Sequence, residues 1–367
     1  MGNWRNGELG NFITLKRGFD LPQQKREDGQ VPIFSSSGIT GTHSTAMVNA
    51  PGVITGRYGT IGEVFYAAED FWPLNTTLFV EDFHGNDAEF IYYFLKTLEW
   101  SKFTSASAVP GINRNTVHKE TVSLPDIETQ RRIASTLSML DEKIKTNTEI
   151  NDNLYAQAKA IFDNHFINID AIPAGWRKGN LLDIANYLNG LAMQKFRPQG
   201  NEIGLPVLKI KELRQGSCDD SSELCSLRIK PEYIIHDGDV IFSWSGSLLV
   251  DIWCGGTCGL NQHLFKVTSD IYDKWFYYLW TAHHLARFIA IAADKATTMG
   301  HIKREELAKA EVLIPCEEDY TSLTSIMQPI FELIISNRIE ARKLAALRDE
   351  LLPKLMSGEI DVSAIQL

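Results

Sequence analysis

Two stretches of the chain carry apolar residues at alternating steps of four and three, the spacing that places side chains on one face of a helix. One stretch follows the Leu-Pro-Asp that begins at Leu124, and the other follows the Ile-Pro-Cys that begins at Ile314. A shift of 190 residues carries the first stripe onto the second. The stripes comprise Ile133, Leu137, Leu140, Ile144, Asn147 and Leu154, and Leu323, Ile330, Ile334, Asn337, Leu344 and Leu351.

The stripes predict two long helices. Two ordinary core helices would also satisfy the period, but the even repetition, which in the first stretch continues to His165, favours a coiled coil. Asn147 and Asn337 stand at equivalent places, and a polar residue in such a seam fixes the register of the helices. A helix from about residue 127 to 166 would be roughly 60 Å long, so we expect it to be a spacer.

The segment that precedes the first helical stretch is repeated before the second. "WRNGELGNFITLKRG" from Trp4 and "WRKGNLLDIANYLNG" from Trp176 share five residues at identical spacing, and "NTTLF" from Asn75 returns as "NQHLF" from Asn261. These segments mix strand-like and helix-like patterns. The sequence therefore predicts an α+β protein with an internal repeat. It consists of two similar mixed α/β domains, at residues 1–125 and 171–314, and long helices at 126–170 and 315–367.

The stretch "VITGRYGTIG" from Val53 raises the question of a phosphate-binding loop. Such a loop needs a following helix and a different glycine spacing, and the next residues read as a strand. The counterpart in the second copy, "FSWSGSLL", retains Gly59 as Gly246 and loses the other glycines. We therefore interpret both stretches as a strand followed by a tight turn.

Composition is that of a globular protein, with 44% hydrophobic and 22% charged residues among 367. No apolar run reaches the roughly 18 residues of a membrane span, and the N-terminus has no signal region, so we expect a cytoplasmic protein with no membrane contact. The net charge is −10, but residues 1–125 carry 10 basic and 13 acidic side chains and residues 176–312 carry 16 of each. The charge balance thus permits a nucleic-acid surface on either copy.

Five cysteines are too few for a disulfide framework and indicate a reducing compartment. Cys254, Cys258 and His263 could suggest a metal, but their spacing is not that of a known zinc finger. We expect buried free thiols and no metal site.

The segments "SLPDIETQRRIASTLSMLDEKIKTNTEIN" and "LAALRDELLPKLMSGEIDV", with the paired turns "GRYGTIG" and "SWSGS", resemble the specificity subunit of type I restriction-modification systems. The resemblance covers essentially the whole chain. The second helix departs from the pattern, because it opens "PCEEDYTSLTSIM" without the Gln-Arg-Arg of the first.

This resemblance implies two target recognition domains that each read one half of a bipartite site in double-stranded DNA. Two long helices packed antiparallel would join the domains and set the gap between the halves. It implies no catalysis and no cofactor on this chain. S-adenosylmethionine, ATP and Mg would bind the partners, which are two modification methyltransferase subunits and restriction nuclease-translocase subunits.

Enzymatic alternatives find little support in the sequence. An adenine methyltransferase would be expected to contain Asn or Asp followed by Pro-Pro and an aromatic residue, and no such tetrapeptide occurs. No P-loop occurs either. A nuclease-like pattern does occur, as Asp126 and the later Asp141-Glu142-Lys143. About four helical turns would separate Asp126 from Asp141, however, so their carboxylates would lie over 20 Å apart and could not share a metal ion. A scaffold holding two protein-binding domains on a coiled coil remains the alternative, and sequence-dependent retention of DNA would distinguish the two.

Side chains that read base edges are chiefly Arg, Lys, Asn, Gln and Ser, while other contacts to phosphate position the protein. Arg57 and Arg114 are the strongest candidates because both lie near glycine in a turn, whereas Trp244 is more often a core residue. The full set of DNA-binding candidates is Arg17, Ser35, Ser36, Ser37, Arg57, Tyr58, Asn113, Arg114, Lys195, Arg197, Lys209, Lys211, Ser243, Trp244, Ser245, Lys303 and Arg304.

Overall fold

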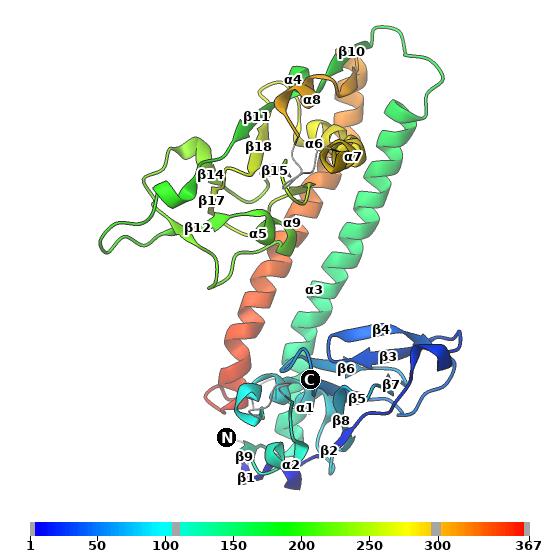
Figure 1. Ribbon diagram of the computed structural model, residues 1–367, viewed down its shortest axis with the longest axis vertical. Helices are drawn as coiled ribbons and strands as arrows, with labels where there is room; N and C mark the ends of the chain where they lie inside the picture. The colour runs from blue at the N-terminus through cyan, green and yellow to red at the C-terminus, as the bar shows by residue number, and fades with distance from the viewer. Residues whose placement is uncertain (1–3, 105–110, 295–301, 363–367) are drawn as a thin grey trace. The chain divides into compact units, whose positions relative to one another are not determined.

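The computed structural model describes residues 4–104, 111–294 and 302–362, and the chain divides into two compact units (Figure 1). The first unit takes in residues 1–142 and 345–367, and the second takes in residues 143–344. The division falls within both long helices. Each unit therefore contains one globular copy together with a part of each helix.

The first copy is built on an antiparallel sheet in the strand order β2-β8-β5-β6. Helix α1 packs on β5 and β6, and its N-terminus is capped by Asp87, which accepts a hydrogen bond from Phe90 N at 2.9 Å. The bounds are β2 (Thr14–Arg17), β5 (Gly52–Gly56), β6 (Val64–Ala67), β8 (Thr77–Asp82) and α1 (Ala88–Lys96). Every residue of β5 is buried, including the polar Thr55.

A smaller sheet and a strand pair complete this copy. The smaller sheet has the order β4-β3-β7, with β3 and β7 parallel, and β1 pairs antiparallel with β9. The remaining elements are β1 (Arg5–Glu8), β3 (Val31–Ser35), β4 (Gly38–His43), β7 (Trp72–Pro73), β9 (Thr121–Leu124), α2 (Arg114–Val117) and short 3-10 turns at Leu9–Asn11, Gln23–Lys25 and Trp100–Phe103.

The second copy repeats this plan. Its main sheet has the order β11-β18-β15-β16, the smaller sheet has the order β13-β12-β17-β14 with β12 and β17 parallel, and β10 pairs with β19. The strands are β10 (Arg177–Asn180), β11 (Asn186–Asn189), β12 (Leu205–Leu208), β13 (Leu224–Cys225), β14 (Ile234–Ile235), β15 (Val240–Ser243), β16 (Leu249–Ile252), β17 (Cys258–Leu260), β18 (Leu264–Thr268) and β19 (Glu311–Ile314). The shared strand order confirms the internal repeat.

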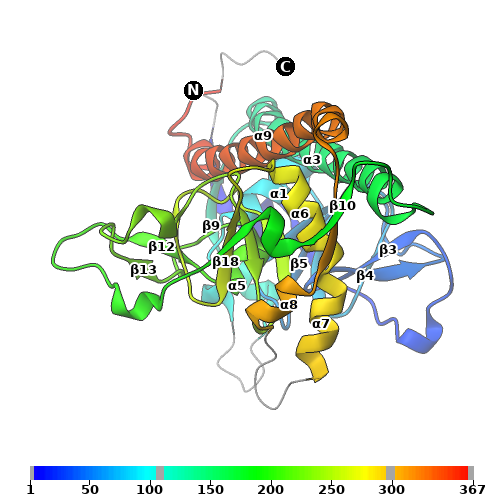
Figure 2. The ribbon, with the colours of Figure 1, turned by 90° about the horizontal axis from the view of Figure 1, so that it is seen from above.

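Helix α6 packs on β16 and β18 of this sheet, and α7 continues from it (Figure 2). The helices of the copy are α4 (Leu181–Ile184), α5 (Ile210–Gln215), α6 (Lys274–His283), α7 (Leu285–Asp294) and α8 (Arg304–Ala308), with 3-10 turns at Met193–Lys195 and Pro231–Tyr233. The two copies differ most after β3 and β12. A hairpin follows β3, whereas helix α5 follows β12 and ends at Gly216, whose φ of 78° closes the helix.

The two long helices are α3 (Ile127–Phe162) and α9 (Glu317–Met356), and they pack antiparallel in both units. Asn147 donates to Glu340 at 2.7 Å, and Asn151, one turn later, donates to the earlier carbonyl of Ile334 at 3.2 Å. All twelve stripe residues are buried or half-buried. The predicted helix pair is therefore confirmed.

Residues at the ends of the stripes also pack into the hydrophobic cores of the globular copies. Ile133 and Leu137 belong to the hydrophobic core of the first copy, and Leu323 belongs to that of the second. The expectation that the first stripe continues to His165 is wrong. A π-helical turn at Asp163–Ile167 adds a residue to the turn, so Phe166 is buried in place of the exposed His165.

The cysteines are free thiols, and Cys225, Cys254 and Cys258 are buried. Burial raises the pKa of the Cys254 thiol to about 11, so it stays protonated at neutral pH. In the part of the chain that the structure describes, no cluster of His, Cys, Asp and Glu side chains could hold a metal ion. No helix of the same residues is long and apolar enough to cross a membrane.

Candidate nucleic-acid interface

The turn after β5 adopts a conformation that requires glycine. The N–H groups of Arg57 and Tyr58 both donate to the carbonyl oxygen of Thr76, at 2.8 and 3.2 Å. A Cβ atom at Gly56 would lie 1.8 Å from the carbonyl oxygen of Thr60, and Gly59 has a φ of 77°. The glycines of this stretch thus serve a tight turn at a strand end, as the sequence predicts.

Two further segments of the first copy lie against this turn. The β3–β4 turn contributes Ser36, whose Oγ would lie 3.2 Å from a Cβ atom placed on Gly59. The chain ahead of α2 contributes Ile112, whose N–H donates to the carbonyl of Arg57 at 3.0 Å. Three segments far apart in sequence therefore converge at one end of the main sheet.

Among the candidate side chains of these segments, Arg57 and Tyr58 are half-buried, and Asn113, Arg114 and Arg17 are exposed. Asn113 and Arg114 follow Ile112 directly, and the Asn113 side chain caps α2 by accepting from Asn115 N at 3.0 Å. Arg17 ends β2, and its partner across the sheet, Leu78, is itself paired with Thr55 just before the turn. The structure thus brings Arg17 to the same end of the sheet.

The three serines of the β3–β4 turn have different surroundings. Ser35 is half-buried, and its hydroxyl donates to the Gly38 carbonyl at 3.1 Å and accepts from Ser37 N at 3.2 Å. Ser37 is exposed, and Ser36 faces the β5–β6 turn. Ser35 therefore supports the turn, and Ser36 and Ser37 are the serines placed to meet a ligand.

The second copy assembles the same three segments. The Ile302 N–H donates to the Trp244 carbonyl at 3.1 Å, which matches the bond from Ile112 to Arg57. Lys303 and Arg304 follow, both exposed, where the first copy has Asn113 and Arg114. A Cβ atom on Gly246 would lie 3.5 Å from Cδ1 of Ile210, the residue between Lys209 and Lys211, so the start of α5 packs against this turn. Helix α5 thereby takes the place of the β3–β4 turn.

Ser243, Trp244 and Ser245 hold their own turn together. The Ser243 hydroxyl is fully buried and donates to the carbonyls of Ser245 and Ser247, at 3.2 and 2.9 Å. The Ser245 hydroxyl is also buried and bonds to Nδ1 of His263 at 2.9 Å. The structure therefore assigns the two serines a supporting place, because burial keeps their hydroxyls from reaching a ligand.

Trp244 is half-buried, and its Nε1 donates to Asn189 Oδ1 at 3.0 Å. Its ring centroid lies 5.8 Å from that of Phe265. This packing favours the core role that the sequence suggested for the ring.

A profile of the family described as "Type I restriction modification DNA specificity domain" matches residues 1–156 and again residues 173–347. The chain belongs to this family. The specificity subunit of the type I restriction enzyme MjaIX from Methanocaldococcus jannaschii is 26% identical over 310 residues, which cover 77% of this chain and 71% of the relative. The HindI specificity subunit from Haemophilus influenzae is 20% identical over 354 residues, with 74% and 77% covered.

The fold agrees with this assignment. The crystal structure of a type I restriction-modification S subunit from M. genitalium superimposes with a TM-score of 0.63 at 15% identity, and the alignment covers 96% of both chains. Specificity subunits are non-catalytic, and the role of this protein is recognition of DNA sequence. The predictions of fold, family and non-enzymatic function are confirmed, and the protein-binding scaffold is not favoured.

The basic candidates of this specificity subunit differ in how their charge is balanced. The Arg57 guanidinium lies 4.5 Å from the centroid of the Tyr58 ring. Among the described residues, neither Arg57 nor Arg114 has a carboxylate within ion-pairing distance. Arg17 has Asp20 at 3.6 Å. The first copy thus presents two cations without acidic partners.

Three basic candidates close to the start of α5 or within it are instead paired with acids. Arg197 and Lys209 both form ion pairs with Glu223, and Lys211 lies 3.4 Å from Asp219. Lys195 is exposed two residues before Arg197. These pairs could not be predicted from sequence, because the acids lie 8 to 26 residues away along the chain.

Some residues of the site were missed from the sequence. Asn189 and His263 hold the Trp244–Ser245 turn, and Thr76 holds the turn of the first copy. Thr76 and His263 lie within the repeated "NTTLF" and "NQHLF" segments, so their repetition was the available signal. Nothing in the spacing indicated that these segments form hydrogen bonds to the turns.

Proposed function

We propose that residues 1–125 and 171–314 are the two target recognition domains, and that each reads one half of a bipartite DNA site through its three converging segments. The observation that carries this proposal is the equivalence of the two faces. The same backbone bond joins Ile112 to Arg57 in one copy and Ile302 to Trp244 in the other. A backbone arrangement shared by both copies, with different side chains at matching places, is what two independent readers need.

The chemistry of the half-buried Arg57 and of the exposed candidates suits this role. Arg57 and Arg114 can bond bidentately to guanine or reach phosphate, and Asn113 can bond to adenine. Lys303 and Arg304 offer the second face a comparable pair of donors. Contacts of both kinds are needed, because phosphate contacts position a protein and base contacts specify the sequence.

We further propose that residues 126–170 and 315–367 form the spacer that sets the gap between the half-sites. Asn147, Asn151 and Asn337 support this role, because each donates a hydrogen bond across the pair in this alignment of the helices. A one-turn slip of α3 along α9 would separate these groups by about 5.4 Å.

A specificity subunit acts with DNA and with the methyltransferase and restriction subunits of its system. We propose two methyltransferase subunits, one for each recognition domain, since the chain repeats both its domain and its helix. S-adenosylmethionine, ATP and Mg would bind these partners. We propose that this DNA-binding complex acts in the cytoplasm.

Duplex retention tests the reading function. The chain and its methyltransferase partner are incubated with a library of duplexes at about 0.15 M salt, and the retained DNA is sequenced. We expect two short conserved segments separated by a fixed unspecific gap. Retention without sequence preference would contradict the proposal, because electrostatic contacts alone give that result.

The spacer is tested by lengthening both helices together. Seven residues inserted after Glu142 and seven after Leu344 preserve the heptad phase and leave the contacts inside each compact unit intact. The insertion adds about 10 Å, which corresponds to roughly three base pairs. We expect a gap longer by about one to three base pairs with both half-sequences retained. An active protein with an unchanged gap would show that the helices do not measure the DNA.

A further inference from the structure

The cations beside α5 in the second recognition face differ from Arg57 and Arg114 of the first in how their charge is balanced. The cations beside α5 are occupied by carboxylates of the same domain, whereas Arg57 and Arg114 have no such partner among the described residues. Phosphate contacts supply most of the non-specific affinity of a DNA-binding protein. Occupied cations beside a DNA-reading turn therefore need an explanation.

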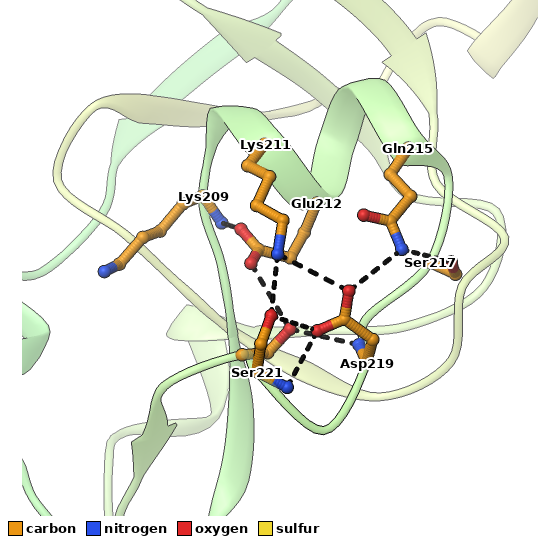
Figure 3. Close-up of polar contacts among 8 residues, drawn as sticks. Lys209, Lys211, Glu212, Gln215, Ser217, Asp219 and Ser221 are labelled. Carbon is orange, nitrogen blue, oxygen red and sulfur yellow. Dashed lines mark hydrogen bonds and ion pairs between the residues drawn. The ribbon is translucent and has the colours of Figure 1, made fainter. Parts of the chain in front are cut away.

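Asp219 sits at the centre of one such site (Figure 3). Its carboxylate accepts from Ser221 N at 2.8 Å, from Ser221 Oγ at 2.5 Å and from Gln215 Nε2 at 3.2 Å, and Lys211 Nζ lies 3.4 Å away. The hydrogen bonds from Ser221 and Gln215, more than the charge of Lys211, hold the pKa of Asp219 well below its usual range. The carboxylate is therefore ionised throughout the physiological range.

The donors around Asp219 are those that bind a phosphate oxygen. A backbone N–H, a hydroxyl, a side-chain amide and an ammonium group come from two neighbouring segments and converge on the two oxygens of one carboxylate (Figure 3). Side chains of these types and backbone N–H groups make the phosphate contacts of DNA-binding proteins. The carboxylate stands where one phosphodiester oxygen could be bound.

Glu223 repeats the arrangement nearby. It forms ion pairs with both Lys209 and Arg197, the latter at 2.6 Å. The hydrogen bond from Lys209, followed by the charges of Lys209 and Arg197, holds the pKa of Glu223 below its usual range. Both acids are exposed, so water can replace their partners and the carboxylates can be displaced.

We propose that Lys211, Gln215 and Ser221 form a binding site for one DNA backbone phosphate, which Asp219 masks in the free protein, and that Glu223 masks Lys209 and Arg197 in the same way. This inference rests on the proposed function, because it takes the α5 segment to be part of the second recognition face.

The mask favours the correct sequence. Displacing Asp219 breaks its hydrogen bonds, and only a complex held in register by base contacts gains enough to do so. A scrambled duplex leaves Asp219 in place and meets a neutralised Lys211. Removing the mask then helps a scrambled duplex by a full phosphate contact, and helps the target duplex only by the smaller cost of displacement.

The test is the variant Asp219→Asn, assembled with the methyltransferase partner and titrated with target and scrambled duplexes from about 0.05 to 0.3 M salt. Asparagine retains an acceptor for Ser221 N, so the loop should keep its fold. We expect scrambled DNA to bind about fivefold more tightly, with a log–log salt slope steeper by up to about 0.9. Target DNA should gain less, so the preference for the target falls.

Glu311→Gln is the matched control, because Glu311 forms an exposed ion pair with Lys178 at 2.7 Å on strands outside the three segments. If Asp219→Asn increases the affinity for scrambled DNA no more than Glu311→Gln does, the proposal that Asp219 masks a phosphate site is wrong. Lys211→Gln provides a second variant, which should weaken target binding more than scrambled binding, because the target complex alone loses a phosphate contact. Equal weakening on both duplexes would also overturn that proposal. A wild-type complex that does not distinguish the duplexes would refute the proposed function instead.

Discussion

The polar layer between the long helices allows a quantitative test of how their register is fixed. Asn151 is 9% exposed, donates to the Ile334 carbonyl at 3.2 Å and accepts from Asn337 Nδ2 at 3.0 Å. A net hydrogen bond between neutral groups contributes about 1 kcal/mol. We therefore expect Asn151→Ala to destabilise the helix pair by about 2 kcal/mol and Asn337→Ala by about 1 kcal/mol.

The double variant separates the shared bond from the rest. Both single substitutions remove the bond between Asn151 and Asn337, so the double variant should lose about 2 kcal/mol rather than 3, a coupling of about 1 kcal/mol. Asn153→Ala is the control, because Asn153 is an exposed asparagine of the same helix and should change stability by less than about 0.5 kcal/mol.

Hydrogen exchange measured by mass spectrometry is the suitable assay. Peptides from residues 147–160 report the free energy of local opening of α3, so unfolding elsewhere in the chain does not enter the value. Single effects that add within about 0.3 kcal/mol would show that Asn151 and Asn337 do not interact, and would refute the register argument.

Three further results are expected. Arg57→Ala should weaken binding to the target by about 1–3 kcal/mol and leave scrambled binding unchanged in filter-binding assays, whereas an equal loss on both would place Arg57 on phosphate. Burial lowers the pKa of His284 below the unfolded value near 6.5, so the neutral side chain contributes fully to stability above about pH 6.5 and this contribution is lost as the pH falls toward the folded pKa. The melting temperature should therefore fall with pH below about 6.5, and His284→Gln should make this fall less steep. Arg342→Ala should lower stability by about 2–3 kcal/mol in the same melts, because Arg342 donates to both Asp237 oxygens at 2.8 Å, and unchanged melting would contradict that contribution.

The repeat and the helices were predictable because both leave periodic signals in sequence. The "WR" segments at Trp4 and Trp176 become strands that pair with the strand just ahead of each long helix, with Arg5 opposite Leu124 and Arg177 opposite Ile314. The apolar stripes predicted the helix seam. They failed only near His165, where a π-helical turn changes the period that the argument assumes.

The recognition faces were predictable as sets of residues but not as surfaces. Arg57 and Asn113 were chosen for their chemistry, and the bond that joins their segments spans more than fifty residues, which no local pattern records. Ser243 was chosen for its hydroxyl, and only the fold shows that this hydroxyl faces inward. The pairing of Lys211 with Asp219 was hidden for the same reason, because it depends on how the chain turns back after α5.

The central claim is that the two globular copies read separate halves of one DNA target. The most direct measurement is the map of methylated adenines in DNA from a host that expresses the methyltransferase partner with a chimaera. In this chimaera, residues 1–125 are replaced by the equivalent domain of another specificity subunit. The account predicts a bipartite methylated sequence in which one half is new while the other half and the gap are those of the parent. A change in both halves would contradict independent readers, and an unchanged sequence would remove the first domain from recognition.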